Sequence, residues 1–319
     1  MDDPTDSPAR WWRGTLARFR RWWSALPGNV RGSIWMSIGG LVFAVMAALI
    51  KHTGRTLPVI EILFIRQLFV LVYLSPAIAK GFPAVFETER LGLHMARVGF
   101  SAVAMVTGFT ALVHLPLAEV TAISFSRTLF TTLLAIIILH EFVGWRRWSA
   151  TAVGFLGVLV IVRPSPADLN EYALLALVSA FFVAGIMIVL RLLSQTERPI
   201  TIMAYQAVCL TVIMGVPTIW LWVTPSWNEL LVLAVIGGAM SIGQYTNIKA
   251  FSAGEAAAVA PFEYGRLLFA TAFGIWFFAE IPTIYTLIGA SIIIASTLYT
   301  MHRNTIKKQP TPVGPTDGQ

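Results

Sequence analysis

Ten apolar stretches, each close to the length that a lipid bilayer requires, recur along the chain. A helix needs about 20 apolar residues to cross the hydrocarbon core of a membrane, and lipid offers backbone N–H and C=O groups no hydrogen-bond partner outside the helix itself. Only 12% of the residues are charged, compared with about a quarter in soluble domains. The sequence therefore predicts an all-α polytopic membrane protein with ten transmembrane helices, near residues 33–50, 58–79, 92–113, 117–139, 146–162, 172–193, 200–223, 229–250, 255–279 and 283–301.

The positively charged residues predict how these helices are oriented. Cytoplasmic loops carry an excess of Lys and Arg, and with the N-terminus inside, 16 of the 23 Lys and Arg residues fall on the inner side. Only Lys51, Arg55 and Arg163 fall on the outer side. We therefore expect a multi-pass protein of the cytoplasmic (inner) membrane with both termini in the cytoplasm. Because the basic residues follow this topology, the net charge of +7 gives no reason to expect nucleic-acid binding.

The two ends of the chain differ from the apolar part between them. Residues 1–30 are basic and Trp-rich, and part of this segment places its apolar residues on one helical face. That pattern is typical of a helix that lies in the membrane interface and is attracted to anionic lipid. The alternative is a disordered basic tail that only sets topology. Residues 304–319 end in a polar stretch rich in Pro and Gly, which we expect to be disordered.

The apolar part consists of two related halves, which we place at residues 31–163 and 164–303. Arg127 and Arg266 are separated by 139 residues, as are Glu141 and Glu280, and SRTLFTTLLAIIILHE resembles GRLLFATAFGIWFFAE. Five spans in each half give the two repeats opposite orientations in the membrane. Inverted-topology repeats of this kind are common in transporters that work by alternating access.

The sequence also resembles the EamA-type members of the drug/metabolite transporter superfamily, from about Arg31 onwards. The resemblance is carried by two helices that end in Glu141 and Glu280 and are followed by glycine-containing helices, and by the segments IRQLFVL and GFLGVLVIVRP. It implies ten helices in two inverted repeats, with a central cavity lined mainly by helices 3, 4, 8 and 9 and also by helices 1 and 6. The second half departs from a regular repeat, because Ala207 stands where Arg66 would recur and EIPTIYTLIG lacks the basic loop of EFVGWRRW.

Arg127 and Arg266 are the first candidates for a substrate site. Each lies ten or eleven residues into its predicted helix, near the middle of the bilayer, where a charge is costly and usually functional. A guanidinium can bind a carboxylate or a phosphate through paired hydrogen bonds. The alternative is a structural role, in an internal ion pair or against backbone carbonyls. For Arg266 the expected partner is Glu263, three residues earlier on the same helical face.

Glu263 can act in two ways. A buried carboxylate without a cation beside it can exchange a proton during transport, which makes proton coupling a hypothesis for this chain. A carboxylate that is held by Arg266 is instead a structural counter-ion. Pro261, two residues earlier, interrupts the hydrogen bonds of the helix and can bend it beside a cavity.

Other polar side chains at membrane depth complete the predicted site. Arg66 is a further candidate for substrate binding, with gating or structural support as the alternative. Glu141 and Glu280 are interpreted as landmarks of the repeat that order the turns after their helices. The remaining candidates, each of which can also be explained by a hydrogen bond between helices, are Tyr205, Gln206, Gln244, Tyr245, Asn247, Tyr264, Trp35 and Ser124.

Together these patterns predict a secondary active transporter that moves a small organic metabolite by alternating access. Four arginines within helices and few deep carboxylates favour a substrate with a carboxylate or phosphate group. No nucleophile motif, metal-ligand spacing or phosphate loop is visible, so we expect no catalytic residues, no metal and no cofactor. The alternatives are an intramembrane lipid-modifying enzyme and a metabolite exporter or drug-efflux protein of the same fold. We expect the small-molecule substrate and membrane lipid as partners, and a monomer or a homodimer.

Overall fold

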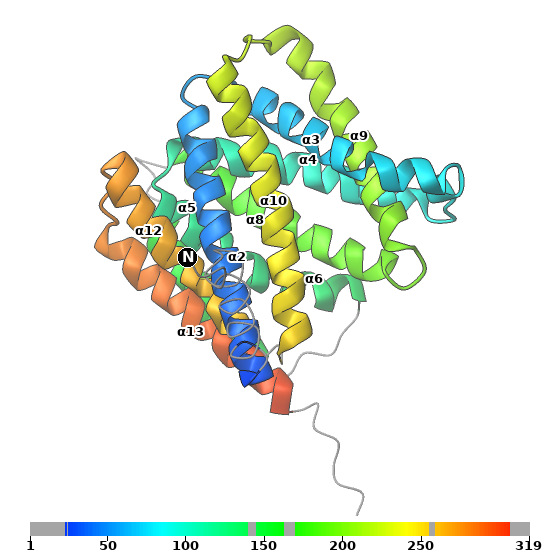
Figure 1. Ribbon diagram of the computed structural model, residues 1–319. Helices are drawn as coiled ribbons and strands as arrows, with labels where there is room; N and C mark the ends of the chain where they lie inside the picture. The colour runs from blue at the N-terminus through cyan, green and yellow to red at the C-terminus, as the bar shows by residue number, and fades with distance from the viewer. Residues whose placement is uncertain (1–22, 24, 140–144, 163–169, 255–258, 307–319) are drawn as a thin grey trace, which may run out of the picture.

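Helices make up the fold. The computed structural model describes residues 23, 25–139, 145–162, 170–254 and 259–306, and in them the chain is helical and contains no β-strand (Figure 1). The predicted all-α class is therefore confirmed for this part of the chain. Glu141 and most of the two predicted tails, at residues 1–30 and 304–319, lie outside the described residues. The helices are α2 Gly28–Thr53, α3 Val59–Gly81, η1 Ala84–Phe86, α4 Leu91–His114, α5 Leu117–Ser124, α6 Arg127–Leu139, α7 Trp145–Val162, α8 Glu171–Leu193, α9 Pro199–Leu221, α10 Trp227–Ala253, η2 Ala260–Tyr264, α12 Gly265–Phe278 and α13 Ile284–Ile306.

Seven helical segments of the described chain are long and apolar enough to cross a membrane. They are α2, α3, α4, α8, α9, α10 and the run Leu117–Ile138, which joins α5 and α6. Two shorter apolar stretches lie within α7 and α13, at Thr151–Val162 and Ile284–Ser296, and α12 has 14 residues. Each predicted span therefore contains a helix, while the count of ten membrane crossings stays a prediction.

Two of the predicted spans are interrupted near their middle. α5 ends at Ser124 and α6 begins at Arg127. Between them, the N–H groups of Phe125 and Ser126 donate to carbonyls three residues back, over 3.2 and 3.0 Å, where an α-helix uses the carbonyl four residues back. In the second half, η2 is a 3₁₀ segment directly before α12 and contains Pro261, which has no N–H to donate. Arg127 and Arg266 thus each lie in the first turn of a helix that follows such a break.

The helices of the two halves pack in a pattern that stays the same when the halves are exchanged. α2 packs along α10, and their counterparts in the other half, α8 and α4, also pack along each other (Figure 1). In the same way, α12 packs against α2, and its counterpart α6 packs against α8. Two further contacts, α3 with α9 and α7 with α13, each join a helix to its own counterpart. The packing therefore has the form of a two-fold relation between the halves.

The contact between α7 and α13 depends on a pair of glycines. A Cβ atom on Gly157 would lie 2.8 Å from the carbonyl oxygen of Gly289, and a Cβ atom on Gly289 would lie 2.5 Å from the carbonyl oxygen of Gly157. Any larger residue at either position therefore pushes the two backbones apart. Small residues permit such close approach between membrane helices.

A buried ion pair fixes the end of α12 to two helices of the first half. Lys51, at the end of α2, is only 4% exposed, and its ammonium group pairs with Glu280 and donates to the backbone carbonyl of Leu115. The second carboxylate oxygen of Glu280 accepts a hydrogen bond of 2.9 Å from the N–H of Leu117, the first residue of α5. The turn before Glu280 is made by Ala279, whose φ of 55° is left-handed. Glu280 therefore orders this turn, as the repeat pattern indicates.

Candidate substrate site

A cavity of about 570 Å³ lies between the two halves, within the range of about 300–1,000 Å³ that is typical of small-molecule sites. Its walls come from α2, α6, α8, α10, η2 and α12. Its lining reaches the C-terminal part of α10, at the end that the positive residues predict to face the cytoplasm. The residues that line it are Met36, Gly40, Phe43, Arg127, Thr128, Thr131, Thr132, Met187, Gln244, Asn247, Phe251, Glu263 and Arg266.

A second, smaller cavity of about 200 Å³ lies toward the opposite ends of the same helices. It is mostly apolar and is lined by the later turns of α4 and by α5, together with parts of α2 and α8. Its lining residues are Phe43, Ala44, Met46, Ala47, Gly108, Phe109, Leu112, Val120, Thr121, Ser124, Arg127, Ala176, Ser179 and Arg266. Phe43, Arg127 and Arg266 line both cavities, so these three residues form the wall between them.

The helices around the cavities are those that the family resemblance implies. With the helices counted as the ten predicted spans, the two linings draw on helices 1, 3, 4, 6, 8 and 9. The broken helices 4 and 9 bring the charged residues to the wall. Helix N-termini favour negative charge, and transporters use interrupted helices in this way to direct half-helix N-termini at anionic groups.

Arg127 forms an ion pair with Glu263 across the boundary between the halves. The Nη2 atom of Arg127 donates to Oε1 of Glu263, and the two side chains are 27% and 37% exposed. The expected partner of Glu263 was Arg266, three residues along the same helix. Glu263 lies in the 3₁₀ segment η2 and Arg266 in α12, and the carboxylate of Glu263 instead meets Arg127 of α6. The ion pair therefore links two repeats and not two turns of one helix.

Arg266 contacts the first half through a hydroxyl group. Its Nη2 atom donates a hydrogen bond of 2.8 Å to Oγ of Ser124, and its guanidinium carbon lies 5.4 Å from the centre of the Phe125 ring. Phe125 in turn packs edge-on against Tyr264, with ring centres 4.8 Å apart. Among the described residues, Arg266 forms no ion pair with a carboxylate.

The structure brings together only some of the other predicted site residues. Gln244 and Asn247 line the larger cavity, and Tyr264 lies beside the wall through its contact with Phe125. Tyr245 is 54% exposed, and its ring packs edge-on against Trp35 with 6.2 Å between the ring centres. Tyr245 is therefore close to the site but contributes to neither cavity lining.

Arg66 lies outside both cavities. It is 3% exposed, and its guanidinium carbon lies 5.4 Å from the centre of the Phe109 ring. Phe109 lines the smaller cavity. The Nη2 atom of Arg66 is 3.5 Å from the side-chain oxygen of Gln67 and 3.3 Å from the sulfur of Met105. Arg66 therefore contacts a lining residue of the smaller cavity but does not line either cavity itself. Its role in substrate binding stays a prediction.

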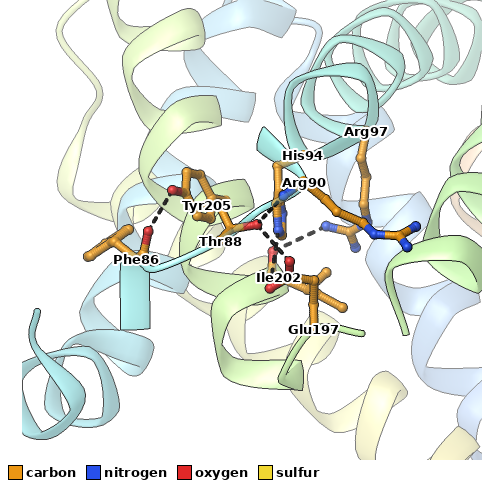
Figure 2. Close-up of polar contacts among 8 residues, drawn as sticks. All are labelled: Phe86, Thr88, Arg90, His94, Arg97, Glu197, Ile202 and Tyr205. Carbon is orange, nitrogen blue, oxygen red and sulfur yellow. Dashed lines mark hydrogen bonds and ion pairs between the residues drawn. The ribbon is translucent and has the colours of Figure 1, made fainter. Parts of the chain in front are cut away.

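Tyr205 belongs to a separate polar cluster at the ends of α4 and α9 (Figure 2). Its hydroxyl donates a hydrogen bond of 2.8 Å to the backbone carbonyl of Phe86, and its ring stacks on His94 with ring centres 4.5 Å apart. Glu197 joins the same cluster, because it accepts a hydrogen bond of 2.6 Å from Thr88 and lies 3.8 Å from Nε2 of His94. Tyr205 thus contacts the loop between α3 and α4 and is absent from both cavity linings.

Sequence reasoning missed three threonines of α6 that line the larger cavity. Thr128, Thr131 and Thr132 follow Arg127 with helical spacing, so they form a polar stripe on the face that carries the arginine. The hydroxyl of Thr131 donates a hydrogen bond of 2.7 Å to the backbone carbonyl of Arg127. The sequence RTLFTT contains this pattern, but a single threonine is common in helices and does not by itself indicate a binding site.

Across the described residues, no three potential metal ligands lie close enough together to hold a metal ion.

Comparison with known protein families agrees with the division of the chain into two halves. The EamA-like transporter family matches the chain twice, at residues 30–163 and 170–301. The chain belongs to the EamA-like transporter family. This result confirms the two-repeat organisation and the resemblance described above, and the family and its named relatives are transporters rather than enzymes.

Relatives of this EamA-like transporter carry different substrate names. It is 29% identical to the S-adenosylmethionine uptake transporter of Rickettsia prowazekii, over 87% of this chain and 95% of the relative. It is 31% identical to the riboflavin transporter of Brucella anthropi, over 79% of this chain and 91% of the relative. It is 28% identical to the pseudopaline exporter CntI of Pseudomonas aeruginosa, over 83% and 94% of the two chains. A crystal structure of a protein with 15% identity superposes with a TM-score of 0.58 over 87% of this chain and 99% of its own, which shows a shared fold.

Proposed function

We propose that this protein is a secondary active transporter that moves a small organic metabolite with a carboxylate or phosphate group across the cytoplasmic membrane by alternating access. The observation that carries the proposal is the position of Arg127 and Arg266 in the wall between two cavities that lie toward opposite ends of the molecule. A group bound at this wall can be reached from either end when the helices around it move. Guanidinium groups at such a wall are suited to an anion.

The proposal includes a particular arrangement in the membrane. The chain crosses the membrane ten times, as two inverted repeats at residues 31–163 and 164–303, with the tails 1–30 and 304–319 in the cytoplasm. Two separate family matches support this arrangement, and so do the equivalent helix contacts that the two halves make. Cysteine-accessibility labelling of positions in the loops tests it, because labelling of a loop from the side opposite to the one assigned contradicts the topology.

S-adenosylmethionine is the first substrate to test. It has a carboxylate, positively charged ammonium and sulfonium groups, and an aromatic base. The two arginines suit the carboxylate, Glu263 suits a cation, and Phe43 and Phe251 offer apolar ring surface within the larger cavity. Riboflavin has no carboxylate and leaves the arginines without an anion. The chemistry of the site therefore favours the substrate named for the Rickettsia relatives over that named for the Brucella relative.

Transport in proteoliposomes tests this function. We expect purified protein to take up labelled S-adenosylmethionine, with excess unlabelled S-adenosylmethionine competing more strongly than excess riboflavin. Equal competition by riboflavin contradicts the role of the carboxylate, and absence of uptake and of efflux from preloaded vesicles contradicts transport of S-adenosylmethionine.

Coupling of transport to protons through Glu263 is part of the proposal. In the described arrangement Arg127 holds the carboxylate, so protonation of Glu263 requires that the two side chains separate during the cycle. We expect Glu263→Gln to abolish transport that is driven by a pH gradient and to spare exchange of substrate for substrate. Equal loss of both activities contradicts proton coupling at this residue.

A further inference from the structure

The two midplane arginines belong to four-residue segments that occupy equivalent places in the two repeats. The segment Ser124–Arg127 has the sequence SFSR, and the segment 139 residues later, Glu263–Arg266, has the sequence EYGR. Both segments span the point where a helix is interrupted and resumes. Ser124 therefore corresponds to Glu263, Phe125 to Tyr264 and Arg127 to Arg266.

These two segments contact each other in a reciprocal way. Arg127 of the first segment forms an ion pair with Glu263, the first residue of the second segment. Arg266 of the second segment donates a hydrogen bond to Ser124, the first residue of the first segment. The corresponding aromatic residues, Phe125 and Tyr264, pack against each other. This is the contact pattern of a two-fold interface, in which a contact between one position of the first copy and another position of the second copy occurs again with the copies exchanged.

The two segments differ in charge at one position, where Ser124 corresponds to Glu263. Arg127 faces a carboxylate, so its positive charge is compensated within the protein. Arg266 faces a neutral hydroxyl, and the Nε atom of Arg266 is buried without a hydrogen-bond partner. A guanidinium without an ion-pair partner gains more from an added opposite charge than one that already pairs with a carboxylate. Of the two arginines in the wall, Arg266 therefore gains more from an incoming anion.

We propose that Arg266, together with the hydroxyl of Ser124, binds the anionic group of the substrate, and that Arg127 is a positioning residue that keeps Glu263 away from Arg266. This assignment rests on the transport function proposed above and gives the two arginines different roles. The two arginines differ in role because Arg127 faces the carboxylate of Glu263, whereas Arg266 faces the hydroxyl of Ser124. Loss of Arg127 then weakens anion binding indirectly, because it frees Glu263 to neutralise Arg266, three residues along the chain.

A rescue experiment separates direct from indirect roles. The probes are succinate and inorganic phosphate, and the measurement is anion-dependent thermal stabilisation of the full-length protein in detergent. We expect Arg266→Gln to raise the apparent dissociation constant by about thirtyfold or more. We expect Arg127→Gln to weaken binding as well, and the double variant Arg127→Gln/Glu263→Gln to restore it to within about threefold of the wild type. If the double variant stays as weak as Arg127→Gln, or if Arg266→Gln binds like the wild type, the assignment is overturned.

A matched pair of variants at Ser124 tests the charge itself. Ser124→Glu places a carboxylate opposite Arg266, whereas Ser124→Gln adds a side chain of almost the same size without charge. We expect Ser124→Glu to lose anion binding by at least about tenfold relative to Ser124→Gln. Equal binding by the two variants contradicts an anion site at Arg266.

The same variants keep the inference distinct from the function on which it rests. Uptake of S-adenosylmethionine by the wild-type protein decides the proposed function, and the order of succinate and phosphate affinities among the variants decides the role of Arg266. A wild-type protein that binds neither anion overturns the anion site, even where uptake is measured.

Discussion

The ion pairs Lys51–Glu280 and Arg127–Glu263 both join the first half of the molecule to the second, and they differ in almost every physical respect. The pair Lys51 and Glu280 is enclosed at the ends of helices, and each partner has a further hydrogen bond to backbone. The pair Arg127 and Glu263 lies in the wall between two cavities, and both side chains remain about one third exposed. The first pair is held by backbone groups on both sides, whereas the second borders a cavity from which a ligand can reach it.

This difference predicts a structural role for the first pair and a functional role for the second. A buried ion pair that is fully hydrogen-bonded contributes little net stability, but removal of one partner is costly because the other charge stays buried. A pair that borders a cavity can be solvated when one partner is lost, so its removal costs less in folding. The two pairs should therefore respond to mutation in opposite ways, one in stability and the other in transport.

The largest effect is expected at the enclosed pair. Lys51→Met leaves Glu280 without its cation, and we expect a loss of about 3–5 kcal/mol in the free energy of unfolding, measured by denaturant titration in detergent. The double variant Lys51→Met/Glu280→Leu should recover most of this loss, because no unpaired charge remains. If the double variant is as unstable as the single one, the cost does not come from the unpaired carboxylate.

The opposite result is expected at the pair in the wall. Arg127→Ala should reduce uptake by about tenfold or more, because Glu263 is then free to neutralise Arg266. Its free energy of unfolding should stay within about 1 kcal/mol of the wild type, because Glu263 is partly exposed. Uptake and denaturant unfolding of the same preparation check both parts, and unchanged uptake by a folded variant removes Arg127 from the site.

A smaller effect is expected when the charge is kept and the shape of the group is changed. Arg127→Lys preserves a cation opposite Glu263 but lacks the planar guanidinium. If Arg127 acts by holding Glu263, uptake should fall by no more than about threefold, measured beside Arg127→Ala. A loss as large as that of Arg127→Ala would instead indicate that the guanidinium binds the substrate directly.

The smallest effect on transport is expected at a polar contact outside both cavities. Tyr205→Phe removes one hydrogen bond, to the backbone carbonyl of Phe86, and should cost about 1 kcal/mol of stability. The Michaelis constant for the transported substrate should remain that of the wild type. A changed Michaelis constant would show that the cluster in Figure 2 affects substrate binding at the wall. Contacts outside the cavities would then not be purely structural.

The sequence predicted the parts of this architecture that depend on periodicity. Apolar length located a helix in each predicted span, and Pro261 indicated the interruption before α12. The interruption between α5 and α6 was not predicted, because no proline or glycine marks it. The cross-repeat partners could not be predicted, because the pairing of Arg127 with Glu263 and of Lys51 with Glu280 depends on how the two halves dock. Tyr205 was assigned to the cavity from its polarity alone, and polarity does not specify which face of α9 meets which neighbour.

The wall shared by the two cavities also determines where a membrane voltage acts. When both cavities are filled with water, the electrical potential changes mainly across the thin layer that contains Phe43, Arg127 and Arg266. A charge that moves a few ångströms through this layer then crosses most of the membrane field, which is worth about 2.3 kcal/mol per elementary charge per 100 mV. A short movement of a charged substrate past Arg266 can therefore couple to nearly the full membrane potential.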